Sequence, residues 1–132
     1  MFELKKITKQ YGQTTVLHET TLTVNDGEFF VLVGAGGSGK TTLLKLLNRL
    51  IEPTSGTILR NGNPLHDLNL RSLRLDTGYV LQQIVLFPNL TVGENIALVP
   101  SMKHIDKNEI RRRSHLWLEK TGFDPLQSHG LI

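Results

Sequence analysis

One short segment, residues 34–41, constrains the fold of this chain more than any other. It reads Gly-Ala-Gly-Gly-Ser-Gly-Lys-Thr and fits the pattern G-x-x-x-x-G-K-[ST], in which backbone N–H groups of a glycine-rich loop surround phosphate oxygens. Residues 28–33, before the loop, form an apolar run that predicts a buried strand, and leucines at helical spacing follow it. A strand, such a loop and a helix in this order predict an α/β fold that binds a nucleotide.

The loop pattern assigns roles to individual residues. Glycines allow the tight turn, so a side chain at Gly36, Gly37 or Gly39 is expected to block either the turn or the phosphates. We expect Lys40 to contact the β- and γ-phosphates of ATP and the Thr41 hydroxyl to ligate Mg²⁺, at a helix start whose dipole favours anions. The predicted nucleotide-binding residues in this segment are Gly34, Ala35, Gly36, Gly37, Ser38, Gly39, Lys40, Thr41 and Thr42.

Alternation and turn residues predict the strands and turns of the remaining chain. Strands are expected over residues 2–7, 20–24, 57–60 and 78–81, with a tight turn at Asn61-Gly62. The strands before residue 28 indicate a small antiparallel unit that leads into the loop.

Helices are expected from Lys40 to just before Pro53, over residues 68–75, over 91–99, and from Asp106 to about Thr121. The last two begin with capping-box spacings, Thr91 with Glu94 and Asp106 with Glu109, and Gly122 is the expected stop of the final helix. Trp117 and Leu118 are expected to face the core side of that helix, with a partner surface as the alternative for Trp117.

Composition narrows the possible classes of protein. The 132 residues include no cysteine, which excludes disulfides, thiolate zinc sites and thiol nucleophiles. A net charge of +3 is too weak to indicate nucleic acid, and the arginines at 111–113 indicate a solvated helix face or a partner contact. No signal peptide and no apolar stretch of ~20 residues is present. We therefore expect a soluble cytosolic protein that reaches a membrane only through a partner.

Hydrolysis of ATP normally needs an acid at the end of an apolar strand, beside the metal. After residue 42 no apolar strand ends in Asp-Glu, and Asp76, Asp106 and Asp124 lie in predicted turns or caps. The sequence therefore predicts a phosphate-binding loop without the hydrolytic acid.

Further segments carry a resemblance to a known family. Residues 8–12 read Thr-Lys-Gln-Tyr-Gly, residues 78–83 read Gly-Tyr-Val-Leu-Gln-Gln, and residues 86–92 read Leu-Phe-Pro-Asn-Leu-Thr-Val. With the loop, they make nearly all of residues 1–127 resemble the nucleotide-binding subunit of ATP-binding-cassette (ABC) transporters. The resemblance implies a P-loop NTPase (RecA-like) core with an N-terminal antiparallel β subdomain over residues 1–86, the start of the helical subdomain over 87–127, and a tail at 128–132.

The same resemblance implies roles and partners. Tyr11 corresponds to the aromatic residue that stacks on adenine, and Gln82 to the Q-loop residue that senses Mg²⁺ and the attacking water, so Gln82 and Lys40 are the expected catalytic residues. The groove around residues 83–99 corresponds to the docking site of a membrane permease, which implies a location at the inner face of the cell membrane. A second ATPase subunit is expected as a homodimer partner, and no nucleic acid is expected.

Residues 28–34, 48–56 and 82–88 resemble the importers of quaternary amines such as glycine betaine, carnitine and choline. The chain has Ala35-Gly36 where the family usually has Pro-Ser, so we expect a looser loop that binds nucleotide less tightly. The family's signature sequence, Walker B strand and switch histidine are expected only after residue 132. The resemblance therefore implies a truncated N-terminal portion of the subunit.

The leading hypothesis is an ATP-binding subunit fragment of an ABC importer, which binds Mg-ATP to power transport of a small solute, a quaternary-amine osmoprotectant. ATPase activity is expected of the full subunit and negligible hydrolysis of this chain alone. The alternative is a non-hydrolysing remnant that binds nucleotide or partners. A nucleoside or nucleotide kinase, with residues 111–113 as lid arginines, is a third hypothesis that the contexts of Tyr11 and Gln82 disfavour.

Overall fold

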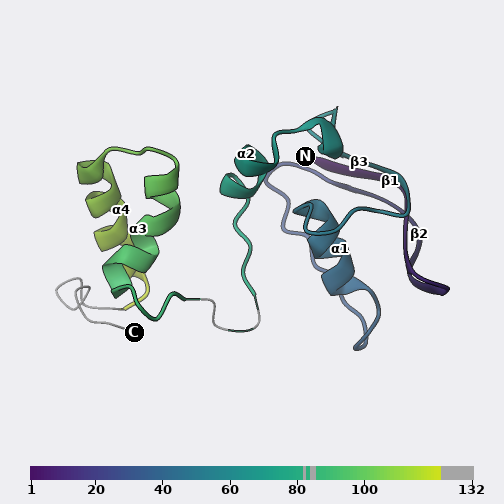
Figure 1. Cartoon of the computed structure of the whole chain (residues 1–132), viewed down its shortest axis with the longest axis horizontal. Helices are drawn as coiled ribbons and strands as arrows, with labels where there is room; N and C mark the ends of the chain where they lie inside the picture. The colour runs from purple at the N-terminus through teal and green to yellow at the C-terminus, as the bar shows by residue number, and fades with distance from the viewer. Residues whose placement is uncertain (82, 84–85, 123–132) are drawn as a thin grey trace. The chain divides into compact units, whose positions relative to one another are not determined.

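The computed structural model describes residues 1–81, 83 and 86–122. The chain divides into two units, Met1–Thr77 and Gly78–Ile132, each with its own elements (Figure 1). Within the described ranges, no helix has the length and apolar character needed to cross a membrane. Gln82 and the tail at 128–132 lie outside the described residues. The boundaries expected between residues 86 and 87 and between 127 and 128 stay predictions.

A four-stranded antiparallel sheet in the order β2-β1-β3-β4 forms the base of the first unit. Its strands are β1 (Phe2–Tyr11), β2 (Thr14–Val24), β3 (Ser55–Arg60) and β4 (Asn63–Pro64). The strands predicted over 2–7, 20–24 and 57–60 are confirmed, and each is longer than predicted. The predicted turn is also confirmed, because Asn61 and Gly62 have φ of 52° and 79°, as a two-residue hairpin of the I′ type requires.

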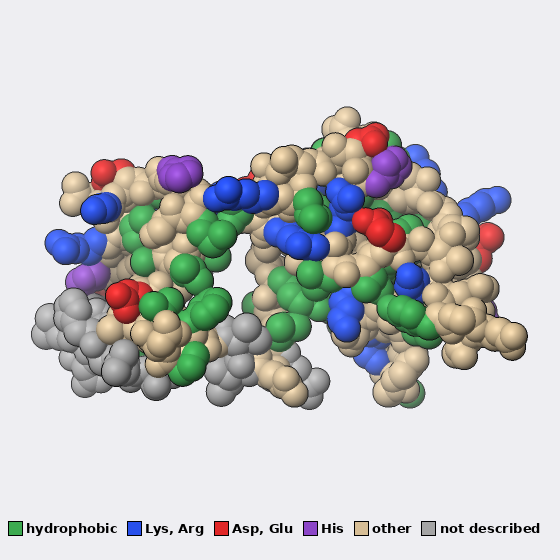
Figure 2. Space-filling model, in the orientation of Figure 1, with side chains coloured by type: hydrophobic (Ala, Val, Ile, Leu, Met, Phe, Trp, Pro, Cys, Tyr) green, Lys and Arg blue, Asp and Glu red, His purple; other side chains and the backbone are tan. Residues whose placement is uncertain are grey.

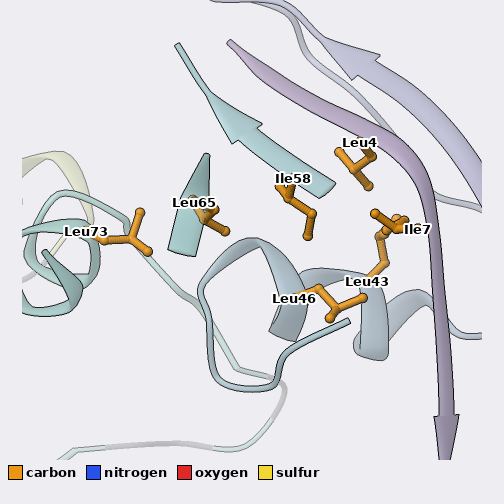
Figure 3. Packing of buried hydrophobic residues seen from close by; sticks show 7 residues of the cluster. All are labelled: Leu4, Ile7, Leu43, Leu46, Ile58, Leu65 and Leu73. Carbon is orange, nitrogen blue, oxygen red and sulfur yellow. The ribbon is translucent and has the colours of Figure 1, made fainter. Parts of the chain in front are cut away.

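Leucines of the helix after the loop join this sheet to form the core of the first unit. The helix is α1 (Lys40–Leu47), and η1 (Leu65–Asp67) and α2 (Leu70–Leu75) follow later in the chain. Leu43 and Leu46 lie on one face of α1 and point toward the strands (Figure 3). The buried cluster consists of Leu4, Ile7, Leu43, Leu46, Ile58, Leu65 and Leu73. It fixes α1, and therefore the loop before it, on the sheet.

The end of α1 differs from the prediction. The helix stops at Leu47, well before Pro53, because Arg49 adopts the left-handed conformation with φ of 46°. The N–H of Leu50 donates to the carbonyl of Lys45 at 2.9 Å, and the N–H of Arg49 donates to Leu46 at 3.0 Å. These two bonds form a Schellman motif, which usually has glycine at the left-handed position.

The strands predicted over residues 28–33 and 78–81 are not formed, so that prediction is wrong. A strand exists only through a ladder to a neighbour, and neither segment has one among the described residues. In the first segment Leu32 packs against the core, whereas Phe29 and Val33 are 93% and 91% exposed. Both segments have no regular secondary structure, because an apolar pattern does not specify the hydrogen-bonding partner that a strand needs.

The second unit contains two helices, α3 (Val92–Met102) and α4 (Lys107–Lys120), which lie side by side in Figure 1. The capping box predicted at Thr91 and Glu94 is confirmed, with each side chain bonded to the other residue's backbone N–H. Hydrogen bonds from Thr91 lower the pKa of Glu94 below its usual value of 4.5. The helix runs past the predicted end and includes Pro100.

Helix α4 starts at the predicted place but uses a different side-chain arrangement. Asp106 accepts hydrogen bonds from the N–H groups of Asn108 and Glu109. The Glu109 carboxylate, instead of completing the box, bonds Arg112 at 2.7 Å and Arg113 at 2.6 Å. Hydrogen bonds from Arg112 and then Arg113 lower the pKa of Glu109 from 4.5 to about 2. Two of the three consecutive arginines thus form a solvated helix face, one of the two alternatives expected for them.

The other end of α4 confirms one expectation about its apolar residues and contradicts another. Gly122, with φ of 79°, follows the helix as predicted. Leu118 is buried, as expected. Trp117 is 56% exposed, so its predicted packing in the core is wrong. Successive helical residues point about 100° apart, and only Leu118 of the pair lies on the buried face.

Candidate nucleotide-binding site

The loop at residues 34–39 uses glycine for two different reasons. Gly37 and Gly39 have φ of 78° and 89°, in the region that side chains rarely adopt. A Cβ on Gly39 would also lie 2.9 Å from the backbone oxygen of Val16, and one on Gly34 would lie 2.7 Å from the Ser38 Oγ. Gly36 differs, because its φ is not left-handed and nothing lies within 4 Å of its Cβ position. The protein itself therefore leaves room for a side chain at Gly36, unlike at Gly39.

Lys40 folds back over this loop. Its Nζ donates to the carbonyl of Gly34 at 2.6 Å, to that of Ala35 at 2.8 Å, and to the Ser38 Oγ at 3.1 Å. A single ammonium group therefore holds both ends of the loop and places one positive charge against it. Because Lys40 is also the first residue of α1, its side chain connects the loop directly to the start of the helix.

The start of α1 has the character of an anion site. Its N-cap is Gly39, and among the described residues no side chain caps the N–H groups of the first turn. The first turn contains no acidic residue, and Leu43 is the first residue whose N–H bonds back, to the carbonyl of Gly39 at 2.9 Å. Uncapped N–H groups at the positive end of a helix favour phosphate. The residues present therefore fit the phosphate groups of a nucleotide.

The predicted metal ligand Thr41 occupies the second position of α1 and is exposed. It offers one hard oxygen atom, of the kind that Mg²⁺ prefers. No cluster of three or more His, Cys, Asp or Glu side chains suited to a metal occurs in the ranges that the structure describes. The arrangement fits a Mg²⁺ ion that takes its remaining ligands from phosphate oxygens and water. Gln82, the second predicted metal ligand, lies outside the described residues.

Tyr11 ends β1 at the turn of the hairpin, and its ring is half exposed. It pairs with Thr14 of β2. Two residues further along β2, Val16 is the neighbour that approaches Gly39 of the loop. The hairpin therefore brings the Tyr11 end of the sheet to the side of the loop. The Nζ of Lys9 lies 4.9 Å from the centroid of the Tyr11 ring, a cation–π contact that orients the ring.

In the second unit, an apolar cavity of about 540 Å³ opens beside α3 and α4. Figure 2 shows apolar side chains exposed on this unit. The cavity is lined by Leu86, Val92, Asn95, Ile96, Trp117, Leu118 and Thr121. Several of these residues belong to the segment 83–99, for which the family resemblance implies a partner.

Two residues with prominent roles in the structure were missed by the sequence analysis. Asn95 makes four hydrogen bonds to the segment before α3, and Arg49 donates to the carbonyls of Leu65 and Leu68 at 3.2 and 3.1 Å. For Asn95 a signal existed, since an asparagine just after a capping box can bond the incoming loop. For Arg49 none existed, because a left-handed arginine has no sequence pattern.

Comparison with known proteins identifies the family. Residues 17–131 match the family model described as ABC transporter. The chain is 43% identical to the osmoprotectant import ATP-binding protein OsmV of Salmonella typhimurium over 94% of its length, and 36% identical to the choline transport ATP-binding protein OpuBA of Bacillus subtilis over 95%. It is also 37% identical to the glutamine transport ATP-binding protein GlnQ of Escherichia coli over 98%.

The chain spans only part of these relatives: 34% of OsmV, 33% of OpuBA and 55% of GlnQ. Among solved structures, it is similar to the dimeric structure of MJ0796, a bacterial ABC transporter cassette, with a TM-score of 0.85 and 31% identity. That match covers 99% of this chain and 61% of the other. It confirms the predicted α/β fold class, of which the described residues show the antiparallel sheet, the loop and the helices. The family match over most of the sequence and this structural similarity show that the chain belongs to the ABC transporter family.

Proposed function

We propose that this chain binds Mg-ATP as the N-terminal portion of the ATP-binding subunit of an ABC importer. One observation carries the proposal: the Lys40 ammonium and the uncapped start of α1 lie at the same glycine-rich loop. Such a loop brings N–H donors and a positive charge close together, which is what a chain of phosphates requires.

Lys40 and Thr41 have separate tasks in this proposal. Lys40 supplies charge to the β- and γ-phosphates, while the N–H groups of the first turn of α1 donate to phosphate oxygens. Thr41 supplies a hydroxyl oxygen to the metal. A bound Mg²⁺ ion neutralises charge on the phosphates.

Tyr11 is the proposed contact for adenine. Its half-exposed ring ends a hairpin whose β2 strand approaches the loop at Gly39, so base and phosphates can be held by one unit. An aromatic face stacked on a flat base excludes water from both surfaces. The Lys9 ammonium on the ring makes this contact sensitive to charge at position 9.

We propose that ATP is hydrolysed by the longer subunit and not by this chain alone. The described acids do not assemble a metal cluster, and the sequence offers no acid after an apolar strand. Gln82 is the proposed sensor of Mg²⁺ and of the attacking water. A second ATPase subunit is the proposed dimer partner, by analogy with the dimeric cassette to which the chain is similar.

The proposed partner is a membrane permease, docked at residues 83–99, which would place the protein at the inner face of the cell membrane. The relatives' names, osmoprotectant import and choline transport, support a quaternary-amine osmoprotectant as the solute. This substrate class is the finest part of the proposal, since GlnQ, named for glutamine transport, is nearly as similar.

A thermal-shift titration with Mg-ATP tests nucleotide binding. At about 100 times Kd, ligand binding should add about 2.7 kcal/mol to the free energy of unfolding. Lys40→Ala should abolish the shift, whereas Lys45→Ala, which removes the same charge from the far end of α1, should keep it. No shift for the wild-type chain would reject nucleotide binding.

A second assay tests the proposal about hydrolysis. Phosphate release by the highly purified chain should not exceed that of Lys40→Ala. A turnover rate that Lys40→Ala abolishes would show that this chain hydrolyses ATP alone.

A further inference from the structure

The segment that leads into α3 is held by one side chain, that of Asn95. The N–H of Phe87 donates to Asn95 Oδ1 at 2.8 Å, and Asn95 Nδ2 donates to the carbonyl of Phe87 at 3.1 Å. The same Nδ2 donates to the carbonyls of Leu90 and Thr91 at 3.2 and 3.0 Å. Both backbone groups of Phe87 are therefore bonded to a single amide, as they would be to a neighbouring strand.

Only an amide can make this set of bonds. It offers an acceptor and two N–H donors on one planar group, so one N–H is shared between two of the three carbonyls, whereas an ionised carboxylate offers acceptors alone. The helix cap is separate, because Thr91 and Glu94 bond each other and leave Asn95 to the loop. Asn95 thus contributes order to residues 87–91 that the capping box does not supply.

The loop that Asn95 holds carries exposed apolar side chains. Leu86 and Phe87 are each 49% exposed, and Leu86 also lines the apolar cavity beside α3. A surface that is already ordered loses less conformational entropy when a partner binds. Asn95 directs its polar atoms into the loop, but its side chain also lines the same cavity, so an effect through the loop has to be separated from a direct contact with the partner.

We propose that Asn95 is a positioning residue, which preforms the apolar surface of Leu86 and Phe87 for an apolar helix of the membrane permease. The inference rests on the proposed function, which assigns residues 83–99 to that partner. It adds a residue whose amide acts through Phe87 and not through a contact of its own with the partner.

The sharpest variant is Asn95→Asp, which keeps the shape and replaces the donors by acceptors. Asn108→Asp is the matched control, because it makes the same change in the same unit and Asn108 contributes only its backbone N–H to the cap. Phe87→Ala removes the side chain through which Asn95 acts. The partner probe is the permease component of the Salmonella typhimurium osmoprotectant import system in nanodiscs, with affinity measured by biolayer interferometry.

Asn95→Asp should weaken binding of this probe about tenfold and speed hydrogen exchange at the N–H groups of Phe87 and Leu90. The melting temperature should stay close to that of the wild type, and the Kd for Mg-ATP within about twofold. Phe87→Ala should weaken binding at least as much, and the double variant no more than Phe87→Ala alone, since both act through one group. Should Asn95→Asp fail to fold, Asn95→Ala removes the same bonds without adding a charge.

If the losses of probe affinity from Asn95→Asp and Phe87→Ala add up in the double variant, the positioning role is wrong. It is also wrong if Asn95→Asp speeds hydrogen exchange in the loop but leaves binding of the probe unchanged. If the probe binds wild type and Phe87→Ala alike, or binds neither, the docking surface itself is wrong, and the exchange data alone then decide whether Asn95 orders the loop. A loss with Asn108→Asp would show that charge, and not loop order, is being measured.

Discussion

Alanine at successive glycines of the phosphate loop should change nucleotide affinity in opposite directions. Gly36 has an ordinary φ and open space at its Cβ position, whereas Gly37 and Gly39 have left-handed φ. The three substitutions add the same methyl group to the same loop. They therefore separate the conformational demand of each position from the effect of side-chain size.

Gly36→Ala should strengthen binding. Glycine loses more conformational freedom than alanine when the loop becomes ordered. At a compatible φ, replacing glycine by alanine therefore stabilises the ordered state by about 0.4–1 kcal/mol. If the whole gain appears when the loop orders around phosphate, Mg-ATP affinity rises about two- to fivefold.

Gly37→Ala and Gly39→Ala should weaken binding. A left-handed conformation costs a residue with a Cβ about 1–2 kcal/mol, which corresponds to a loss of about five- to thirtyfold. Gly39→Ala should lose more, because its Cβ would lie 2.9 Å from the Val16 backbone oxygen, which cannot rotate away. The expected order of affinity is Gly36→Ala, wild type, Gly37→Ala, Gly39→Ala.

Isothermal titration calorimetry with Mg-ATP gives the four dissociation constants, and circular dichroism confirms that each variant is folded. A Gly36→Ala variant that binds more weakly than wild type would refute the reasoning, since the Cβ would then meet the phosphates themselves. Equal losses at all three positions would show that the left-handed φ values do not govern the loop.

Three other changes probe the scaffold around the site. Leu46→Ala, in the buried cluster, should lower the free energy of unfolding measured in urea by about 2–5 kcal/mol. Leu50→Ala, at a position that is 44% exposed, should lower it by far less, and equal losses would show that Leu46 is not part of the core. Arg49→Gly should be about 1 kcal/mol more stable than Arg49→Ala, because both variants lose the guanidinium hydrogen bonds but only glycine suits a φ of 46°. The reverse order of stability would contradict the left-handed conformation at the end of α1. Glu109, with its pKa lowered from 4.5 to about 2 chiefly by Arg112, should stabilise α4 above pH 4.5 and lose this effect as pH falls through 2; a carboxyl NMR signal that titrates near 4.5 would refute the pairing.

Features determined by a few adjacent residues could be predicted from the sequence. The loop at 34–39 leads directly into α1, as the motif predicts, and the capping box at Thr91 and Glu94 starts α3 at the expected residue. The turn at Asn61-Gly62 has the expected left-handed φ values. In each case the deciding interactions lie within four residues of each other, so the pattern contains the physics.

Features that depend on distant partners could not be predicted in this way. Residues 28–33 have the composition of a buried strand, but burial and pairing depend on neighbours that the pattern does not specify, and Phe29 is exposed. The end of α1 depends on the Arg49 guanidinium reaching the carbonyls of Leu65 and Leu68. That contact offsets the cost of a left-handed arginine, and no local signal announces it.

The lysine of the loop shows how the usual test of such a site should be interpreted. Lys40 Nζ donates to Gly34, Ala35 and Ser38 within the loop, so Lys40→Ala removes internal bonds of the loop as well as a charge. Its loss of affinity then measures both the missing contact to phosphate and the disorder of the loop, and overstates the first. Gly36→Ala changes loop order alone. Gly36→Ala should therefore raise affinity by a larger factor in the Lys40→Ala background than in the wild type if disorder contributes, and by the same factor in both if the lysine acts by charge only.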